Sequence, residues 1–166
     1  MISLQRWRAA GVCASLIATS LLPCAGVAGT ATTTFNVTAT VLATCAVSAS
    51  NVDFGTYTGA PLDGTGSIDV TCTNLTTYTV ALDAGTGSGA TVASRKMTGP
   101  SSQTLNYSLY QNAGRSTLWG TLGAAQAVSG TGSGMAQSLT VYGRARASQT
   151  PGAGSYSDTV TVTVAY

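Results

Sequence analysis

The chain has 166 residues, and only 12 of them are charged: seven Lys or Arg and five Asp, with no His and no Glu. Proton transfer near neutral pH usually draws on His, Glu or a perturbed Lys, so this composition argues against an enzyme, and we expect no catalytic residue. A low charge together with 44% hydrophobic residues is not a disordered composition, and the length suits one domain.

Residues 1–28 have the pattern of a cleaved signal peptide. Two arginines near the start precede an uncharged stretch over residues 9–28, which ends on the small residues Gly26-Val27-Ala28. An uncleaved membrane anchor is the alternative, because about 20 uncharged residues can just span a bilayer. A proline and many small residues in the stretch favour cleavage after Ala28, and therefore export.

Cleavage changes the charge balance. It removes two of the seven basic residues, which leaves five against five Asp and a net charge of zero. A neutral chain offers no electrostatic footprint for nucleic acid or anionic lipid. We expect the pairs Arg95-Lys96 and Arg144-x-Arg146 to keep strand edges soluble rather than to contact partners.

Two cysteines, Cys45 and Cys72, remain after cleavage. In an exported chain an isolated pair predicts one disulfide, and a spacing of 27 residues corresponds to roughly 3.6 kcal/mol in the loop-entropy model. A metal site is the competing interpretation, but two thiols without any His fall short of the usual four ligands. We therefore expect neither a metal nor a cofactor.

The first segment after the predicted cleavage site alternates between apolar and polar residues. Its apolar positions are Phe35, Val37, Ala39 and Val41, within residues 31–41. The period of two predicts a β-strand with one apolar edge. It precedes the first cysteine of the predicted disulfide, and no turn residue links it tightly to the rest of the chain. An ordinary first strand, paired within its own domain, would have the same pattern.

Period-two alternation continues through the rest of the chain. The apolar positions are Ile68, Val70 and Cys72; Tyr78, Val80 and Leu82; Leu105, Tyr107 and Leu109; Leu139 and Val141; and Val160, Val162, Val164 and Tyr166. Stretches rich in Gly, Pro and Ser separate these runs, and no helix of ten or more residues stands out. Short strands at such spacing indicate an antiparallel sandwich or barrel.

The strand predicted over residues 159–166 stops at an aromatic residue, Tyr166. A domain with its last strand in this position would expose a sheet edge, which favours aggregation unless something pairs with it. Alternation alone does not distinguish a partner-facing role for these valines from ordinary core positions, because any sandwich would bury them.

A series of motifs in chain order resembles a known family. The motifs are Cys45, Phe54-Gly55-x-Tyr57, Cys72, Arg95-Lys96-Met97, Leu105-x-Tyr107-x-Leu109-Tyr110, Trp119-Gly120, Tyr142-Gly143 and Gly154-x-Tyr156-x-Asp158-Thr159-Val160. Their order, the cysteine placement and the aromatic end resemble the spore coat protein U domain, a family that includes the pilus subunits of archaic, Csu-type chaperone–usher systems. The resemblance covers residues 30–166.

The resemblance implies an all-β fold: an incomplete immunoglobulin-like Greek-key β-sandwich that is completed by a donor strand. The implied organisation is a signal peptide over residues 1–28, a donor-strand extension over 29–42 and a sandwich domain over 43–166. A periplasmic chaperone would first fill the gap, and at an outer-membrane usher the extension of the next pilus subunit would replace it. The implied location is the periplasm and then the cell surface, where a pilus supports adhesion and biofilm formation.

The resemblance also implies roles for particular residues. Phe35, Val37, Ala39 and Val41 would be the donor residues that enter a neighbour's groove. Val160, Val162, Val164 and Tyr166 would form the face of the C-terminal strand that meets the chaperone or the donor strand, with the Tyr166 carboxylate as an anchor for basic chaperone residues.

Two other functions compete with a pilus subunit. A monomeric secreted coat or carbohydrate-binding module would stack sugars on Trp119 and on exposed tyrosines, although a large aromatic residue is more often buried in the core. A secreted hydrolase has little support, because no motif places a Ser beside a base.

Overall fold

The computed structural model describes residue 26 and residues 28–166. The predicted signal peptide falls almost wholly outside the described residues. The chain separates into two units, residues 1–38 and residues 39–166, and each is described by itself.

The segment over residues 28–44 contains no strand, and each of its residues is exposed. Phe35 and Val37 are each 84% exposed and Val41 is 81% exposed. The described segment shows no strand pairing, so its role as a donor strand or as a first strand stays a prediction. An alternating segment without a ladder partner needs one from elsewhere to become a strand.

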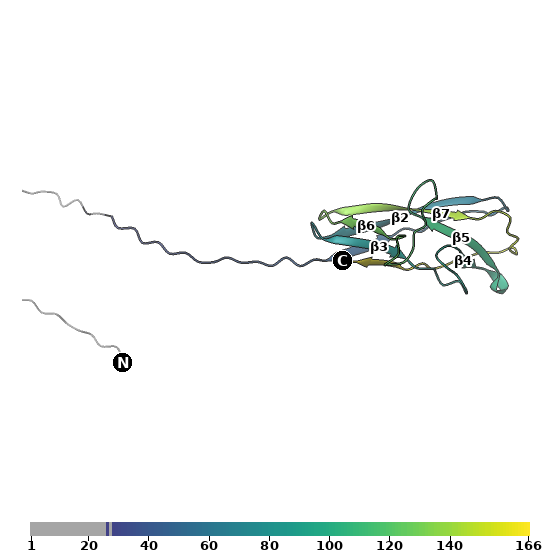
Figure 1. The fold of residues 1–166 in the computed structure, drawn as a ribbon, viewed down its shortest axis with the longest axis horizontal. Coiled ribbons are helices and arrows are strands. Elements are labelled where there is room, and N and C mark those ends of the chain that lie inside the picture. Colours follow the sequence, from purple (N-terminus) through teal and green to yellow (C-terminus); the bar gives the residue numbers. More distant parts are fainter. Residues whose placement is uncertain (1–25, 27) are drawn as a thin grey trace, which may run out of the picture. The chain divides into compact units, whose positions relative to one another are not determined.

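Residues from Cys45 onward form a sandwich of two antiparallel sheets (Figure 1). The strands are β1 (Cys45–Ala49), β2 (Leu62–Cys72), β3 (Thr77–Leu82), β4 (Arg95–Thr98), β5 (Thr104–Tyr110), β6 (Val128–Thr131), β7 (Ala136–Ala145) and β8 (Val162–Ala165). One sheet has the order β1-β2-β7-β5-β4 and the other β6-β3-β8. A 3-10 turn, Pro100–Ser102, joins β4 to β5. The predicted all-β sandwich is confirmed.

Helical structure is scarce in the part of the chain that the structure describes. The 3-10 turn is its one helical element, and no helix there has the length and apolarity needed to cross a membrane.

The core lies between the two sheets, where the predicted alternation places it. Ile68 and Val70 of β2 and Val80 of β3 are at most 1% exposed. Trp119 is also 1% exposed, and its indole Nε1 donates to the Val80 carbonyl over 3.0 Å. Trp119 is therefore a core residue, and the sugar-stacking role considered for it is wrong.

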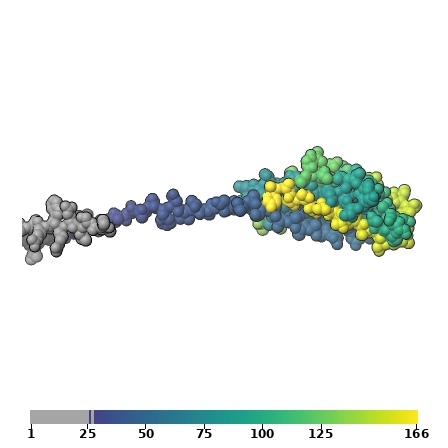
Figure 2. Space-filling model, turned by 90° about the horizontal axis from the view of Figure 1, so that it is seen from below, coloured from purple at the N-terminus to yellow at the C-terminus, as the bar shows by residue number. Residues whose placement is uncertain are grey.

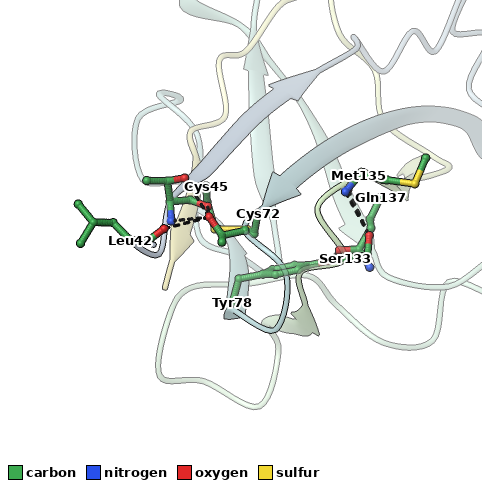
Figure 3. The surroundings of a disulfide bond; sticks show 9 residues. Leu42, Cys45, Cys72, Tyr78, Ser133, Met135 and Gln137 are labelled. Atoms are coloured by element: carbon green, nitrogen blue, oxygen red, sulfur yellow. Dashed lines mark hydrogen bonds between the residues drawn. A yellow bond between two sulfur atoms is a disulfide. The ribbon is translucent and has the colours of Figure 1, made fainter. Parts of the chain in front are cut away.

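The predicted disulfide joins Cys45 and Cys72, the directly paired residues at the start of β1 and the end of β2 (Figure 3). Next to it, the Thr73 backbone N–H donates to the Thr44 carbonyl over 2.9 Å, and the Thr73 hydroxyl donates to the Leu42 carbonyl over 3.2 Å. These bonds and the disulfide fix the point at which the chain enters the sandwich.

A groove between two unpaired sheet edges as the candidate functional site

Each sheet has two edge strands, β1 and β4 in one sheet and β6 and β8 in the other. β1 pairs only with β2, and β8 pairs only with β3. The chain after β1, residues 50–57, belongs to neither sheet, and the chain before β8, residues 151–161, forms no strand but bridges to Thr98 of β4 through Ser157. Figure 2 shows the C-terminal residues in yellow running along one face of the domain. The sandwich is thus left without a strand between these two segments.

The gap between the two segments is hollow. One cavity of about 510 Å³ lies between residues 49–54 and residues 156–162, and a second of about 540 Å³ lies between residues 52–57 and residues 151–156. The two cavities share Val52, Asp53, Phe54, Met97 and Tyr156, so they are direct neighbours, and together we call them the groove.

The floor of the groove is the hydrophobic core itself. Ile68, Leu82, Met97, Tyr107, Leu109 and Val141 line the first cavity, and each is at most 9% exposed in spite of the opening. An open groove with an apolar floor, flanked by segments that form no strand, is a surface to which a β-strand can be added, because its side chains fill the pockets while its backbone pairs with a sheet edge.

The structure divides the four residues predicted for the C-terminal face. Val160 and Val162 line the groove, and Val164 packs against the core; all three remain partly exposed. Tyr166 is 63% exposed and does not line the groove. It borders a separate shallow hollow beside Tyr78 and Thr131.

The predicted donor residues are exposed. Phe35, Val37 and Val41 are more than four-fifths exposed, and Ala39 is exposed as well. This segment therefore presents a row of exposed apolar side chains.

A polar cluster at the rim of the groove was not predicted from the sequence. The Tyr107 hydroxyl donates to Asp158 Oδ2 over 2.7 Å, while Asp158 Oδ1 accepts from the backbone N–H and the hydroxyl of Thr86, each over 2.8 Å. Burial and the hydrogen bond to Asp158 raise the pKa of Tyr107, so its hydroxyl stays protonated. The cluster ties the start of the C-terminal segment to the core.

A buried cation lies behind the groove floor. Arg95 has no exposed surface, and its guanidinium donates to the carbonyls of Asp83 (2.8 Å), Trp119 (2.8 Å), Val92 (3.0 Å) and Leu82 (3.4 Å). Burial lowers the pKa of Arg95, while Tyr107, Asp83 and Asp158 oppose that shift. The expectation that Arg95 keeps a strand edge soluble is wrong, because its guanidinium N–H groups donate to backbone carbonyls inside the domain.

Acid should destabilise this domain, whereas a change around neutrality should not. Burial raises the pKa of Asp83, but hydrogen bonds from Thr161 and Gly85 outweigh it and leave the pKa below 3.8; a hydrogen bond from Arg144 lowers the pKa of Asp63. A carboxyl with a lowered folded-state pKa stabilises the fold above its unfolded pKa, and that stability is lost as the pH falls through the folded pKa.

The chain has no His, so no side chain with an ordinary pKa titrates between about pH 5 and 7. We expect the free energy of unfolding, measured by urea denaturation at a series of pH values, to be flat over that range and to fall below about pH 4. A step in stability between about pH 5.5 and 7 would contradict this assignment.

The Spore Coat Protein U domain model matches residues 31–163. The chain is 34% identical over 161 residues to Protein U of Myxococcus xanthus, covering 84% of this chain and 87% of that protein. A similar solved structure is the chaperone–tip adhesion subunit pre-assembly complex from archaic chaperone–usher Csu pili of Acinetobacter baumannii, with a TM-score of 0.58 and 25% identity over 76% of this chain. The match spans 41% of the chain in that structure.

Proposed function

Because this chain belongs to the Spore Coat Protein U domain family, we propose that it is a structural subunit of a chaperone–usher-type surface pilus and that it polymerises by donor-strand exchange. One observation carries the proposal. The sandwich has an open groove with an apolar floor, and the same chain has an alternating segment whose apolar side chains are exposed. Each feature supplies what the other lacks.

The predicted donor residues suit the apolar floor of the groove in chemistry. In a strand, alternate residues point to the same face and lie about 6.7 Å apart, so the four apolar positions from Phe35 to Val41 span about 20 Å. Fully burying Phe35, Val37 and Val41 would contribute roughly 5 to 9 kcal/mol before the cost of ordering the segment. The intervening Asn36, Thr38 and Thr40 are polar and suit the outer, solvated face of an added strand.

A contact of this kind joins unlike surfaces of successive subunits. The extension of one subunit enters the groove of another, whose own extension remains free to enter a third. Such a heterologous contact does not close on itself and generates a filament. The donor-strand contact would bury uncharged side chains. This agrees with the composition, because the five basic and five acidic residues of the mature chain leave no net charge to drive association.

A subunit with an open groove is prone to aggregate before assembly. Its core side chains face solvent along the gap, and β8 presents an unpaired edge. We propose that a periplasmic chaperone covers the groove and the edge of residues 160–165 until an outer-membrane usher mediates the exchange. On this proposal the predicted signal peptide directs export, and the assembled pilus supports adhesion and biofilm formation.

Deleting residues 29–42 tests the proposal. The shortened subunit keeps the whole sandwich, so we expect it to be exported and recovered with its chaperone, but to form no fibres by electron microscopy and no multimers that resist detergent at room temperature.

Adding a synthetic peptide of residues 31–42 should displace the chaperone and raise the melting temperature of the shortened subunit. A peptide with Phe35, Val37 and Val41 all replaced by Ser is the matched control. Fibres that still form from the shortened subunit would overturn the donor-strand proposal.

A further inference from the structure

The outer face of the five-stranded sheet carries a pair of tyrosines. Leu109 and Val141 point inward and line the groove, so the residues next to them in sequence, Tyr110 and Tyr142, point to the opposite face. Tyr110 of β5 and Tyr142 of β7 are direct cross-strand partners. Both rings are partly exposed, and directly opposed side chains in a sheet lie about 5 Å apart. Together the two rings place aromatic surface on this face.

The basic residues gather on the same face. Of the five basic residues among those that the structure describes, Arg95 is buried. Lys96, Arg144 and Arg146 alternate with inward-facing residues of β4 and β7, and Arg115 reaches this face from the loop after β5, where its guanidinium lies 5.9 Å from the centre of the Tyr142 ring. The groove side, by contrast, is lined by two acids, Asp53 and Asp158.

One acid, Asp63, holds the arginines in place. Arg144 donates to both oxygens of Asp63, over 2.7 and 2.9 Å, and Arg115 Nη1 lies 3.2 Å from Asp63 Oδ2. Arg115 also donates to the Gly143 carbonyl over 3.1 Å. One carboxylate between two guanidinium groups leaves a net positive charge, and Arg146 adds a second, exposed one. The Arg115 side chain is only 13% exposed and also donates to the Ala113 carbonyl, while Arg146 donates to the Ala93 carbonyl. A guanidinium has five donors, so the more exposed Arg144 and Arg146 still have N–H groups for a ligand.

We propose that this tyrosine–arginine face, made of Tyr110, Tyr142, Arg115, Arg144 and Arg146, binds an acidic polysaccharide. Sugar rings present apolar C–H faces that pack on aromatic rings, and their carboxylate or sulfate groups accept paired hydrogen bonds from guanidinium groups. The face supplies both features side by side and already ordered. Its net charge of about two is small for a duplex nucleic acid, whose non-specific binding rests on many phosphate contacts. The inference does not depend on the proposed function, because the groove lies on the other side of the sheet.

Titration of the exported full chain with polygalacturonate, a polymer of acidic sugars, tests this assignment, with uncharged dextran as the control polymer. We expect binding to polygalacturonate alone. Tyr142→Thr should weaken it about tenfold, and so should Arg146→Gln, because one removes a stacking ring and the other a charge-assisted donor. Tyr142→Phe keeps the ring and should bind like the original chain. Unchanged melting temperatures for all three variants would show that the sandwich is intact.

Several results would overturn the proposal. They are binding to dextran as strong as to polygalacturonate, no binding to polygalacturonate, or equal binding by the Tyr142→Thr and Tyr142→Phe variants. Tighter binding to phosphatidylglycerol vesicles or to double-stranded DNA than to polygalacturonate would assign the face to a different partner and also overturn it. Fibre formation is a separate readout: Tyr142→Thr should leave it unchanged, so failure of this inference is distinguishable from failure of the donor-strand proposal.

Discussion

Replacing Val37 with Asp should abolish fibre formation while leaving the subunit folded. Val37 is 84% exposed in the single chain and belongs to no strand, so the substitution removes no contact of the sandwich. In a neighbour's groove the same side chain would face the apolar floor. An ionised carboxylate buried there without a partner would cost several kcal/mol, comparable to the whole gain from the donor residues.

The adjacent residue gives a matched control. Thr38 has the opposite phase of the alternation, so Asp at residue 38 adds the same charge on the solvated side of the inserted strand. We expect Thr38→Asp to assemble nearly as the original chain does and Val37→Asp not to assemble, as judged by electron microscopy and by detergent-resistant multimers. Equal assembly of the two variants would show that the phase of the segment is irrelevant, which a groove-filling strand does not allow.

The alternation of the sequence predicts the core of this sandwich because the physical rule is local. Ile68 and Val70, Val80 and Leu82, and Leu105 and Leu109 are buried at a period of two, as the pattern indicates. The disulfide is equally accessible from the sequence, since it requires only a count of cysteines and the expectation of export. Whether a segment forms a strand, and which of its side chains face the core, thus depends on residues that are near one another in the chain.

The strands that the alternation missed are short and carry little apolar signal. β1 reads Cys-Ala-Val-Ser-Ala, β4 reads Arg-Lys-Met-Thr and β6 reads Val-Ser-Gly-Thr, and each forms an edge of its sheet. Edge strands need only one partner and tolerate polar residues, so their sequences look like loops. The predicted strand over residues 159–166 is also longer than β8, because its first half leaves the β3 ladder and the chain just before it bridges to Thr98 of β4 through Ser157.

The groove depends on segments about 100 residues apart in the chain. Its walls come from residues 49–57 and residues 151–162, and neither stretch has a pattern that indicates a cavity. A missing strand leaves no residues to read in the sequence. What the sequence does show is the other half of the arrangement, the apolar alternation from Phe35 to Val41, together with a family resemblance that covers both parts.

Replacing Arg95 with Met should be among the most destabilising single changes in the domain. Met has a similar length and fills the space, but it removes four hydrogen bonds to the carbonyls of residues 82, 83, 92 and 119. A buried acceptor left without a partner costs about 1–3 kcal/mol. Because four carbonyls lose their donor together, the free energy of unfolding should fall by about 3 kcal/mol or more. Urea denaturation of the disulfide-intact chain measures this.

Lys96→Met is the control for Arg95→Met. The two residues are neighbours in β4, but Lys96 faces outward and donates one hydrogen bond, to the Ser88 carbonyl over 3.1 Å. Its replacement should change the free energy of unfolding by no more than about 0.5 kcal/mol. Arg95→Lys should be intermediate, because one ammonium group cannot reach carbonyls that a planar guanidinium spans. Similar losses for Arg95→Met and Lys96→Met would show that the buried bonds do not support the fold. A large loss of unfolding free energy in Arg95→Met alone would mean that the buried Arg95 guanidinium holds the groove floor, to which Leu82 belongs, in place.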